Sequence, residues 1–155
     1  MYPGAFALTT PDKPAIVMGG SGFTQTFAEL DAAANRLSRL LRSAGVQPGD
    51  HVAICMENHD RYFEVLWGCH YAGAVYTACS SRLTSHELSY ILNDCAAKVF
   101  ITSKQSGKRL AMDGYRKGPG ARLVLQELTD LLAIGHVPLA TLERAPSPLR
   151  VEHAP

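Results

Sequence analysis

The sequence predicts an α/β fold in which a parallel sheet is connected by crossover helices. Between residues 27 and 102, helix-type and strand-type hydrophobic patterns alternate three times, an order typical of parallel sheets. Two of the helical patterns open on a Thr-x-x-Glu capping box, at Thr26 and at Thr84. The chain has 155 residues, 46% hydrophobic and 19% charged, which is enough for one globular domain with a sizeable core.

A short β-hairpin is expected before the first helix. Residues 15–18 and 23–25 are short strand-type runs, and Gly19-Gly20-Ser21-Gly22 between them suits a turn. A phosphate-binding glycine loop is the alternative interpretation. Such a loop needs G-x-x-x-x-G-K-[ST], or G-x-G-x-x-G opening a helix, and the sequence contains neither pattern. We therefore expect a turn.

The clearest helix is expected from Phe27 to Ala44. Its hydrophobic residues recur three and four positions apart, so they form one stripe that can pack on a sheet. Gly45 suits the left-handed position that follows a helix. The stripe consists of Phe27, Leu30, Ala34, Leu37, Leu41 and Ala44.

The second helix, from about Asp60 to Ala72, carries hydrophobic residues on more than one side. Asn58 or Asp60 is the expected N-cap, and Gly73 is expected to end the helix. A helix of this kind is normally buried on both sides, so we expect one side to pack on the sheet and the other to need protein that this chain does not provide. The two sides are Phe63, Leu66 and Trp67, and Tyr62, Val65, Cys69 and Ala72.

The third helix is expected to open at the capping box of Thr84 and Glu87. Its hydrophobic face is Leu88, Ile91, Leu92 and Cys95, and the strands around the helices are expected at 51–56, 74–78 and 98–102.

After Thr102 the pattern weakens. Residues 104–122 hold six basic residues against one acidic residue; a phosphate or nucleic-acid patch is the alternative to the solvated connection that we expect. A strand at 123–125 and a helix at 127–133 are expected next. We therefore expect a partial N-terminal domain over residues 1–134 and a proline-containing tail or linker over 135–155.

Charge and hydropathy argue against several classes of protein. The net charge of +1 gives no general attraction to nucleic acid or to anionic membranes. The first ten residues lack the pattern of a signal peptide, and the most apolar stretch, residues 65–79, is too short to span a bilayer. We expect a cytoplasmic protein without a transmembrane segment.

The sequence contains no complete catalytic or metal-binding motif, so no catalytic, cofactor-binding or metal-ligating residue is assigned. The cysteines lack C-x-x-C spacing and lie among apolar residues, so buried, reduced thiols are expected. They are Cys55, Cys69, Cys79 and Cys95.

Three histidines and one loop have residue types that are used in catalysis or in phosphate binding. His70 is expected to be a packing residue. A Cys–His pair of Cys55 with His51 or His59 requires the fold to bring the two side chains together. Residues 102–108 are rich in phosphate-binding residue types but match no complete loop motif.

An ordered series of short motifs resembles the opening of the AMP-binding, adenylate-forming enzymes, and fatty-acid–CoA ligases are the most similar subgroup. The series covers about residues 11–104. It departs from the family at Ala78-Cys79-Ser80, where many members have proline, an apolar residue and Asn or Asp. The motifs include Pro11-Asp12-Lys13-Pro14-Ala15, Thr26-Phe27-Ala28-Glu29-Leu30, Pro48-Gly49-Asp50, Glu57-Asn58, Ala72-Gly73-Ala74, Arg82-Leu83-Thr84 and Lys98-Val99-Phe100-Ile101-Thr102-Ser103.

The resemblance implies the first sub-domain of the adenylate-forming fold and a reaction in two steps. In that family a carboxylate attacks the α-phosphorus of Mg-ATP, and a thiol, usually of CoA, then displaces AMP. The family's phosphate loop, metal-binding glutamate, ribose-binding aspartate and C-terminal lysine do not occur here. The fragment is therefore expected to bind none of ATP, Mg²⁺ and CoA by itself and to be inactive.

The resemblance also implies a partner, and two other classes of protein are alternatives to it. The remainder of the enzyme, or a second copy of this chain, is the expected partner. A stand-alone, non-catalytic interaction module or a degenerate remnant of such an enzyme is the alternative. The missing glycine fingerprint argues against a flavodoxin-like nucleotide binder.

Overall fold

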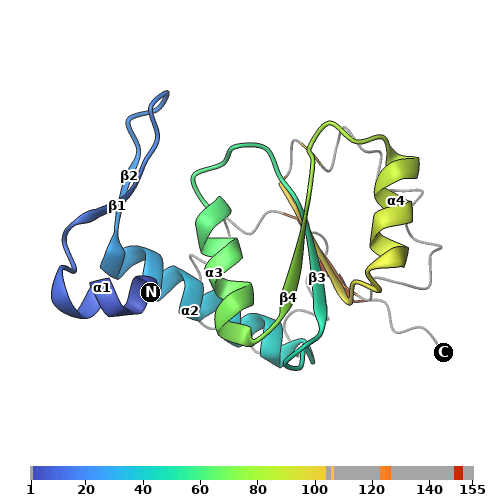
Figure 1. Cartoon of the computed structure of the whole chain (residues 1–155), viewed down its shortest axis with the longest axis horizontal. Helices are drawn as coiled ribbons and strands as arrows, with labels where there is room; N and C mark the ends of the chain where they lie inside the picture. The colour runs from blue at the N-terminus through green and yellow to red at the C-terminus, as the bar shows by residue number, and fades with distance from the viewer. Residues whose placement is uncertain (1, 104–105, 107–122, 127–148, 152–155) are drawn as a thin grey trace.

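The computed structural model of the protein describes residues 2–103, 106, 123–126 and 149–151. Helices α2 and α3 lie on one side of a five-stranded sheet and α4 lies on the other, while α1 and the β1–β2 hairpin stand beside the sheet (Figure 1). The elements, in chain order, are α1 (Pro3–Thr9), β1 (Pro14–Val17), β2 (Thr24–Thr26), α2 (Phe27–Ser43), β3 (His51–Cys55), α3 (Tyr62–Ala72), β4 (Val75–Cys79), α4 (Ser85–Asp94), β5 (Val99–Thr102), β6 (Leu123–Gln126) and β7 (Leu149–Val151).

The sheet confirms the predicted fold class. Its strand order is β4-β3-β5-β6-β7, and the first four strands pair in parallel. Parallel neighbours need crossover connections: α3 connects β3 to its neighbour β4, and α4 connects β4 to β5 on the other side of β3. The predicted hairpin is also present as the antiparallel pair β1–β2.

The strand β7 was not expected from the sequence. It pairs with β6 in antiparallel register and lies within the segment 135–155, which we expected to be a tail or linker. A strand of three residues is too short for a period-2 pattern to be recognised. The expected helix at 127–133 and the basic segment 104–122, apart from Ser106, lie outside the described residues.

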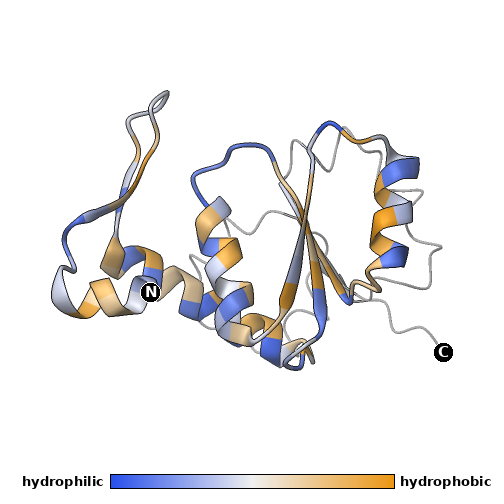
Figure 2. Cartoon of the chain, viewed as in Figure 1, coloured by the Kyte–Doolittle hydropathy of each residue, from blue (hydrophilic) through white to orange (hydrophobic). Residues whose placement is uncertain are grey.

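Two hydrophobic clusters fill the two faces of the sheet. Successive side chains of a strand point to opposite faces. Val52 and Ile54 of β3 therefore pack with α2 and α3, and Ala53 and Cys55 pack with α4. Figure 2 shows the hydrophobic colouring concentrated on the strands and on the sides of the helices that face them.

Local signals correctly placed the starts and ends of several helices. Both capping boxes are formed: the backbone N–H of Glu29 donates to Thr26 Oγ1 at 3.3 Å, and that of Glu87 donates to Thr84 Oγ1 at 3.3 Å. Gly73 follows α3 with a φ of 78°, a left-handed conformation that costs glycine little because it has no Cβ.

The predicted N-cap of α3 is wrong. Arg61 occupies the N-cap position and makes no side-chain capping bond. Nδ1 of His59, and not Asp60, accepts a hydrogen bond from the backbone N–H of Arg61 at 3.1 Å. The backbone N–H of Tyr62 instead donates to the carbonyl oxygen of His59 at 3.0 Å, so a backbone turn leads into the helix.

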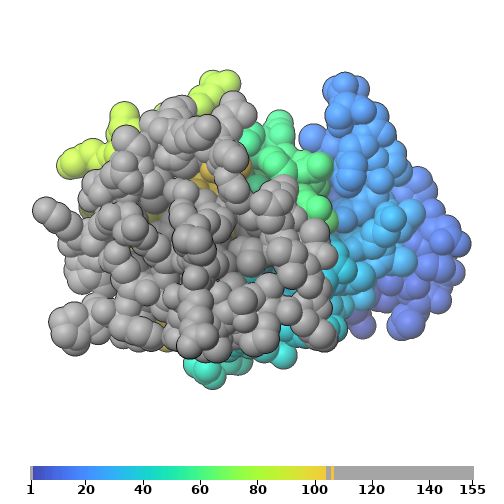
Figure 3. All heavy atoms as spheres, turned by 180° about the vertical axis from the view of Figure 1, so that it is seen from behind, coloured from blue at the N-terminus to red at the C-terminus, as the bar shows by residue number. Residues whose placement is uncertain are grey.

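The helix α1 was also not expected from the sequence. Pro3 is at its first position, which suits proline because the N–H it lacks would have no helical partner there. The ring of Phe6 stacks on that of Phe27 with centroids 4.7 Å apart, and the backbone N–H of Gly4 donates to Tyr71 Oη at 3.0 Å. In the rear view of Figure 3 the N-terminal residues form a lobe at one side of the molecule.

The two hydrophobic sides of α3 have different surroundings. Val65, Cys69 and Ala72 are fully buried in the cluster with α2 and the sheet. On the opposite side Phe63 is 49% exposed, and the half-buried Trp67 contacts the ring of His70 with centroids 5.5 Å apart. The described residues thus cover the second side only in part: Leu66 packs against the cluster with α2 and the sheet, while Phe63 remains exposed.

Candidate functional site

A polar cluster lies where β3 and β5 end, side by side, in the sheet. Ser103 Oγ donates to Glu57 Oε2 at 2.5 Å, and Ser106 Oγ donates to the same oxygen at 2.7 Å. The backbone N–H of Ser106 donates to Ser103 Oγ at 3.0 Å. Open α/β sheets bind ligands beyond the carboxyl ends of their strands, so this cluster is the candidate site. We call Glu57, Ser103 and Ser106 the carboxyl-end cluster.

The sheet itself fixes the position of the carboxyl-end cluster. Cys55 of β3 pairs in register with Thr102 of β5, and Thr102 Oγ1 donates to the carbonyl oxygen of Cys55 at 2.9 Å. Each strand is followed within two residues by a member of the cluster, Glu57 after β3 and Ser103 after β5. Both serines are buried.

The hydrogen bonds of the cluster keep Glu57 ionised. Partial burial alone would raise its pKa, but the hydroxyl donors of Ser103 and Ser106 favour the charged form, and the net effect is a lowered pKa. A nearby His59 acts in the same direction.

The cluster does not fit the phosphates of a nucleotide. Both hydroxyls already donate to a carboxylate, and the negative charge of Glu57 repels phosphate. The phosphate-type residues noted at 102–108 are therefore committed to internal bonds at Thr102, Ser103 and Ser106, and the other residues of that segment lie outside the described part. The arrangement can hold the segment after β5 against the loop after β3.

We expect the stability of the chain to depend on Glu57 in acid. A carboxyl group whose pKa is lowered by folding stabilises the folded state above its ordinary pKa, near 4.5 for Glu57. That contribution is lost as the pH falls through the lowered, folded value. The unfolding midpoint, followed by circular dichroism between pH 6 and pH 3, should thus fall less steeply for Glu57→Gln than for the wild type. Parallel profiles would contradict this role.

A second polar group joins the hairpin to α3. Gln25 Nε2 donates to Glu64 Oε1 at 2.5 Å, and Arg61 Nη1 lies 3.2 Å from Glu64 Oε2. Glu64 and Gln25 are both buried, so the carboxylate needs these two partners. The role of the group is to fix the hairpin on the body of the chain.

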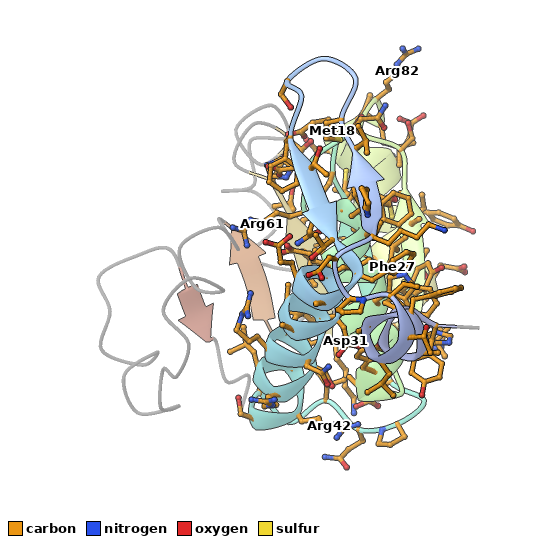
Figure 4. All side chains as sticks on the ribbon, turned by 90° about the vertical axis from the view of Figure 1, so that its left-hand side faces the viewer. Met18, Phe27, Asp31, Arg42, Arg61 and Arg82 are labelled. Carbon is orange, nitrogen blue, oxygen red and sulfur yellow. The ribbon has the colours of Figure 1, made fainter. Side chains whose placement is uncertain are left out.

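An open groove of about 540 Å³ lies between α1, α2 and the end of α3. Tyr71 Oη donates to Asp31 Oδ1 at 2.7 Å across it, and Figure 4 shows Asp31 and Arg42 along α2. Burial and the bond to Asp31 raise the pKa of Tyr71 to about 12, so this phenol remains a proton donor at neutral pH. Its bonds join the three helices.

The structure separates Cys55 from His51, one of its two candidate partners for Cys–His chemistry. His51 begins β3 and Cys55 ends it, so about four residues at 3.3 Å each separate the two. His59 contacts Asp60, and His70 is exposed beside Trp67.

The cysteines, all within the described part of the chain, form no disulfide. Burial raises the pKa of Cys69 to about 12 and that of Cys79 to about 11, so both remain protonated thiols. In the residues that the structure describes, no group of three metal-ligating side chains comes together.

Sequence reasoning did not identify the carboxyl-end cluster. One signal in the sequence could have found it. Glu57 follows one predicted strand, Thr102 ends another, and Ser103 follows that second strand. Since the two strands were not known to be neighbours, their ends could not be placed together from the pattern alone.

The sheet, its crossover helices and the polar residues at the strand ends define an α/β domain of the kind found in enzymes. The AMP-binding enzyme family matches residues 5–145. The chain belongs to that family, and the resemblance inferred from the short motifs is confirmed.

Named relatives agree with this assignment. A feruloyl-CoA synthase of Amycolatopsis is 38% identical over 110 residues, which are 71% of this chain and 22% of that protein. The long-chain-fatty-acid–CoA ligase FadD13 of Mycobacterium tuberculosis is 34% identical over 61% of this chain and 19% of that protein. The chain thus spans about a fifth of the length of these relatives.

Solved structures show the same fold. A fatty acyl CoA synthetase of Mycobacterium tuberculosis superposes with a TM-score of 0.75 and 26% identity over 86% of this chain and 27% of that one. The N-terminal domain of FACL13 from the same organism gives the same score over 35% of its chain. The predicted fold, that of the N-terminal part of an adenylate-forming enzyme, is confirmed. Among the described helices none is long and apolar enough to cross a membrane.

Proposed function

We propose that this chain supplies the N-terminal part of an ATP-dependent ligase that activates a carboxylic acid and joins it to CoA. The observation that carries the proposal is the family match over residues 5–145, together with relatives that are named as CoA ligases and synthases. In such a ligase the acid is adenylated by Mg-ATP, and the thiol of CoA then displaces AMP.

The described residues have a structural role in the proposed ligase. The carboxyl-end cluster is occupied by its own hydrogen bonds and carries a negative charge, so it is unsuited to ATP. Stabilising the transferring phosphoryl group requires positive or metal-bound groups. The sequence lacks the family motifs that would supply them, so adenylation requires polypeptide beyond these 155 residues.

Two classes of acid are candidates for the substrate. The ordered motifs favour a fatty acid. The higher identity to the feruloyl-CoA synthase, 38% against 34% for the long-chain-fatty-acid–CoA ligase, favours an aromatic acid as the second candidate.

We expect the purified chain alone to show no adenylation. Incubation with ATP, Mg²⁺, labelled pyrophosphate and either fatty acids or ferulate should give pyrophosphate exchange no faster than buffer. The full-length feruloyl-CoA synthase of Amycolatopsis, with ferulate, is the positive control. Exchange by this chain that depends on the added acid would overturn the proposed inactivity and would identify the acid.

A further inference from the structure

Two arginines of α2 line the groove between α1, α2 and the end of α3. Arg39 and Arg42 are both exposed and lie one turn apart. Among the described residues the guanidinium of Arg39 has no hydrogen-bond or ion-pair partner. That of Arg42 is held by one bond, in which Nη2 donates to the carbonyl oxygen of Tyr71 at 2.6 Å. Because a guanidinium has five N–H donors, most donors of the pair are free to bind a ligand.

A buried hydroxyl group lies beside these arginines. Ser38 also lines the groove and is only 4% exposed. Its hydroxyl makes no hydrogen bond within the part of the chain that the structure describes, whereas Ser43 on the same helix donates to the carbonyl oxygen of Leu40 at 2.8 Å. Buried polar groups are rarely left without a partner. The missing partner of Ser38 is thus one that enters the groove. We call Ser38, Arg39 and Arg42 the arginine site.

The acidic residue of the groove is bound elsewhere. Asp31 Oδ1 accepts from Tyr71 Oη at 2.7 Å, and Oδ2 accepts from Asn35 Nδ2 at 3.0 Å. Asp31 precedes Arg39 by eight residues on α2, which is about 12 Å along a helix. Its charge therefore does not neutralise the arginine site, and that end of the groove attracts anions.

The α1 side of the groove is mainly apolar. It is formed by Tyr2, Ala7 and Leu8, of which Tyr2 is 51% and Leu8 85% exposed. Sites for small molecules typically combine apolar walls with a few polar groups, in volumes of about 300–1,000 Å³. The groove, with about 540 Å³, has both features.

We propose that this groove binds a phosphate monoester that carries a small apolar or aromatic group. The phosphate is bound by the arginine site, and the organic group packs on Tyr2 and Leu8. A phosphate monoester has a charge of roughly −1.5 to −2 at neutral pH, which suits two guanidinium groups, and arginine binds phosphate oxygens through paired N–H donors. The carboxyl-end cluster takes no part, so the proposal is independent of the proposed ligase activity.

Phenyl phosphate is the probe, titrated calorimetrically into the full 155-residue chain. The wild type should bind it saturably. Arg39→Ala should weaken binding roughly tenfold or more, as expected for the loss of hydrogen bonds to a charged group. Ser38→Ala should weaken it severalfold. Neither substitution removes a bond within the described part of the chain, so both variants should keep the unfolding midpoint of the wild type.

The matched control is Arg82→Ala, which removes the same charge from an exposed position. Figure 4 shows Arg82 and Arg42 at opposite ends of the molecule. This variant should bind phenyl phosphate as tightly as the wild type. Equal losses of affinity in Arg82→Ala and Arg39→Ala would show general electrostatic attraction and would overturn the site. Full affinity in Arg39→Ala, or no saturable binding by the wild type, would also overturn it.

Two other anions test the class of ligand. Benzoate has the ring but a single charge, and inorganic phosphate has the charge but no ring. Both should bind more weakly than phenyl phosphate. Benzoate binding as tightly would overturn the assignment to phosphate, and inorganic phosphate binding as tightly would overturn the role of Tyr2 and Leu8.

Vesicles that contain phosphatidic acid distinguish a lipid headgroup from a soluble source of the same phosphate monoester. Cosedimentation of the wild type that Arg39→Ala abolishes would support the site and identify the lipid as the source. Binding of phenyl phosphate without cosedimentation would support the site and identify a soluble ligand. Binding of neither probe would overturn the proposal.

Discussion

Replacing Phe100 by alanine should destabilise the chain by about 3–5 kcal/mol, the usual range for deleting a buried phenylalanine side chain. Phe100 is in the middle of the sheet on β5 and is fully buried in the cluster with α4. The loss combines the transfer energy of the ring with the cavity that it leaves. Because domains of this size are stable by only about 5–15 kcal/mol, the urea unfolding midpoint should fall sharply.

The matched control for Phe100→Ala is the same substitution at Phe63, which is 49% exposed on α3. Phe63→Ala should change the stability of the isolated chain by about 0.5 kcal/mol or less, as surface substitutions usually do. Equal losses of stability at the two positions would show that the burial of Phe100 is not the cause of the destabilisation.

Gly68→Ala should destabilise the chain by about 1–3 kcal/mol, because it overpacks the contact between α2 and α3. A Cβ atom at residue 68 would lie 2.6 Å from Cδ2 and 2.8 Å from Cβ of Leu37, far closer than van der Waals contact. Since Leu37 Cβ is fixed to its helix, the two helices must move apart. Urea unfolding followed by circular dichroism measures the loss.

Two further variants test the cause of the Gly68→Ala loss. Gly20→Ala is the control, because no atom lies within 4 Å of the added Cβ and its stability should be unchanged. Combining Gly68→Ala with Leu37→Ala should cost less than the sum of the two single substitutions, since residues in contact are not additive. Simple additivity would contradict the clash.

The parts of the fold that were predicted depend on neighbours in sequence. The capping boxes at Thr26 and Thr84 each join residues three positions apart, so the motif alone contains the interaction. The stripe on α2 was likewise visible as a spacing, and its members Leu30, Leu37 and Leu41 are buried. Alternation of such local patterns was enough to indicate the parallel sheet.

The parts that were missed depend on contacts between distant residues. The seven-residue α1 is too short to be stable alone, and its contacts with Phe27 and Tyr71 come from other helices. The carboxyl-end cluster joins Glu57 to residues 46 and 49 positions later. Asp60 had the residue type of an N-cap, but the N-cap position is taken by the next residue, Arg61.

The sheet topology also sets the order in which the chain can fold. Strand β3 lies between β4 and β5, and the bond that ties its end to β5 spans 47 residues. Parallel pairing over such separations requires large loops to close before any contact compensates for the lost chain entropy, which makes folding slow. During synthesis β3 is made first and then remains unpaired on one side until β5 has been made. In that interval a hydrophobic strand of the sheet is exposed to chaperones and to aggregation.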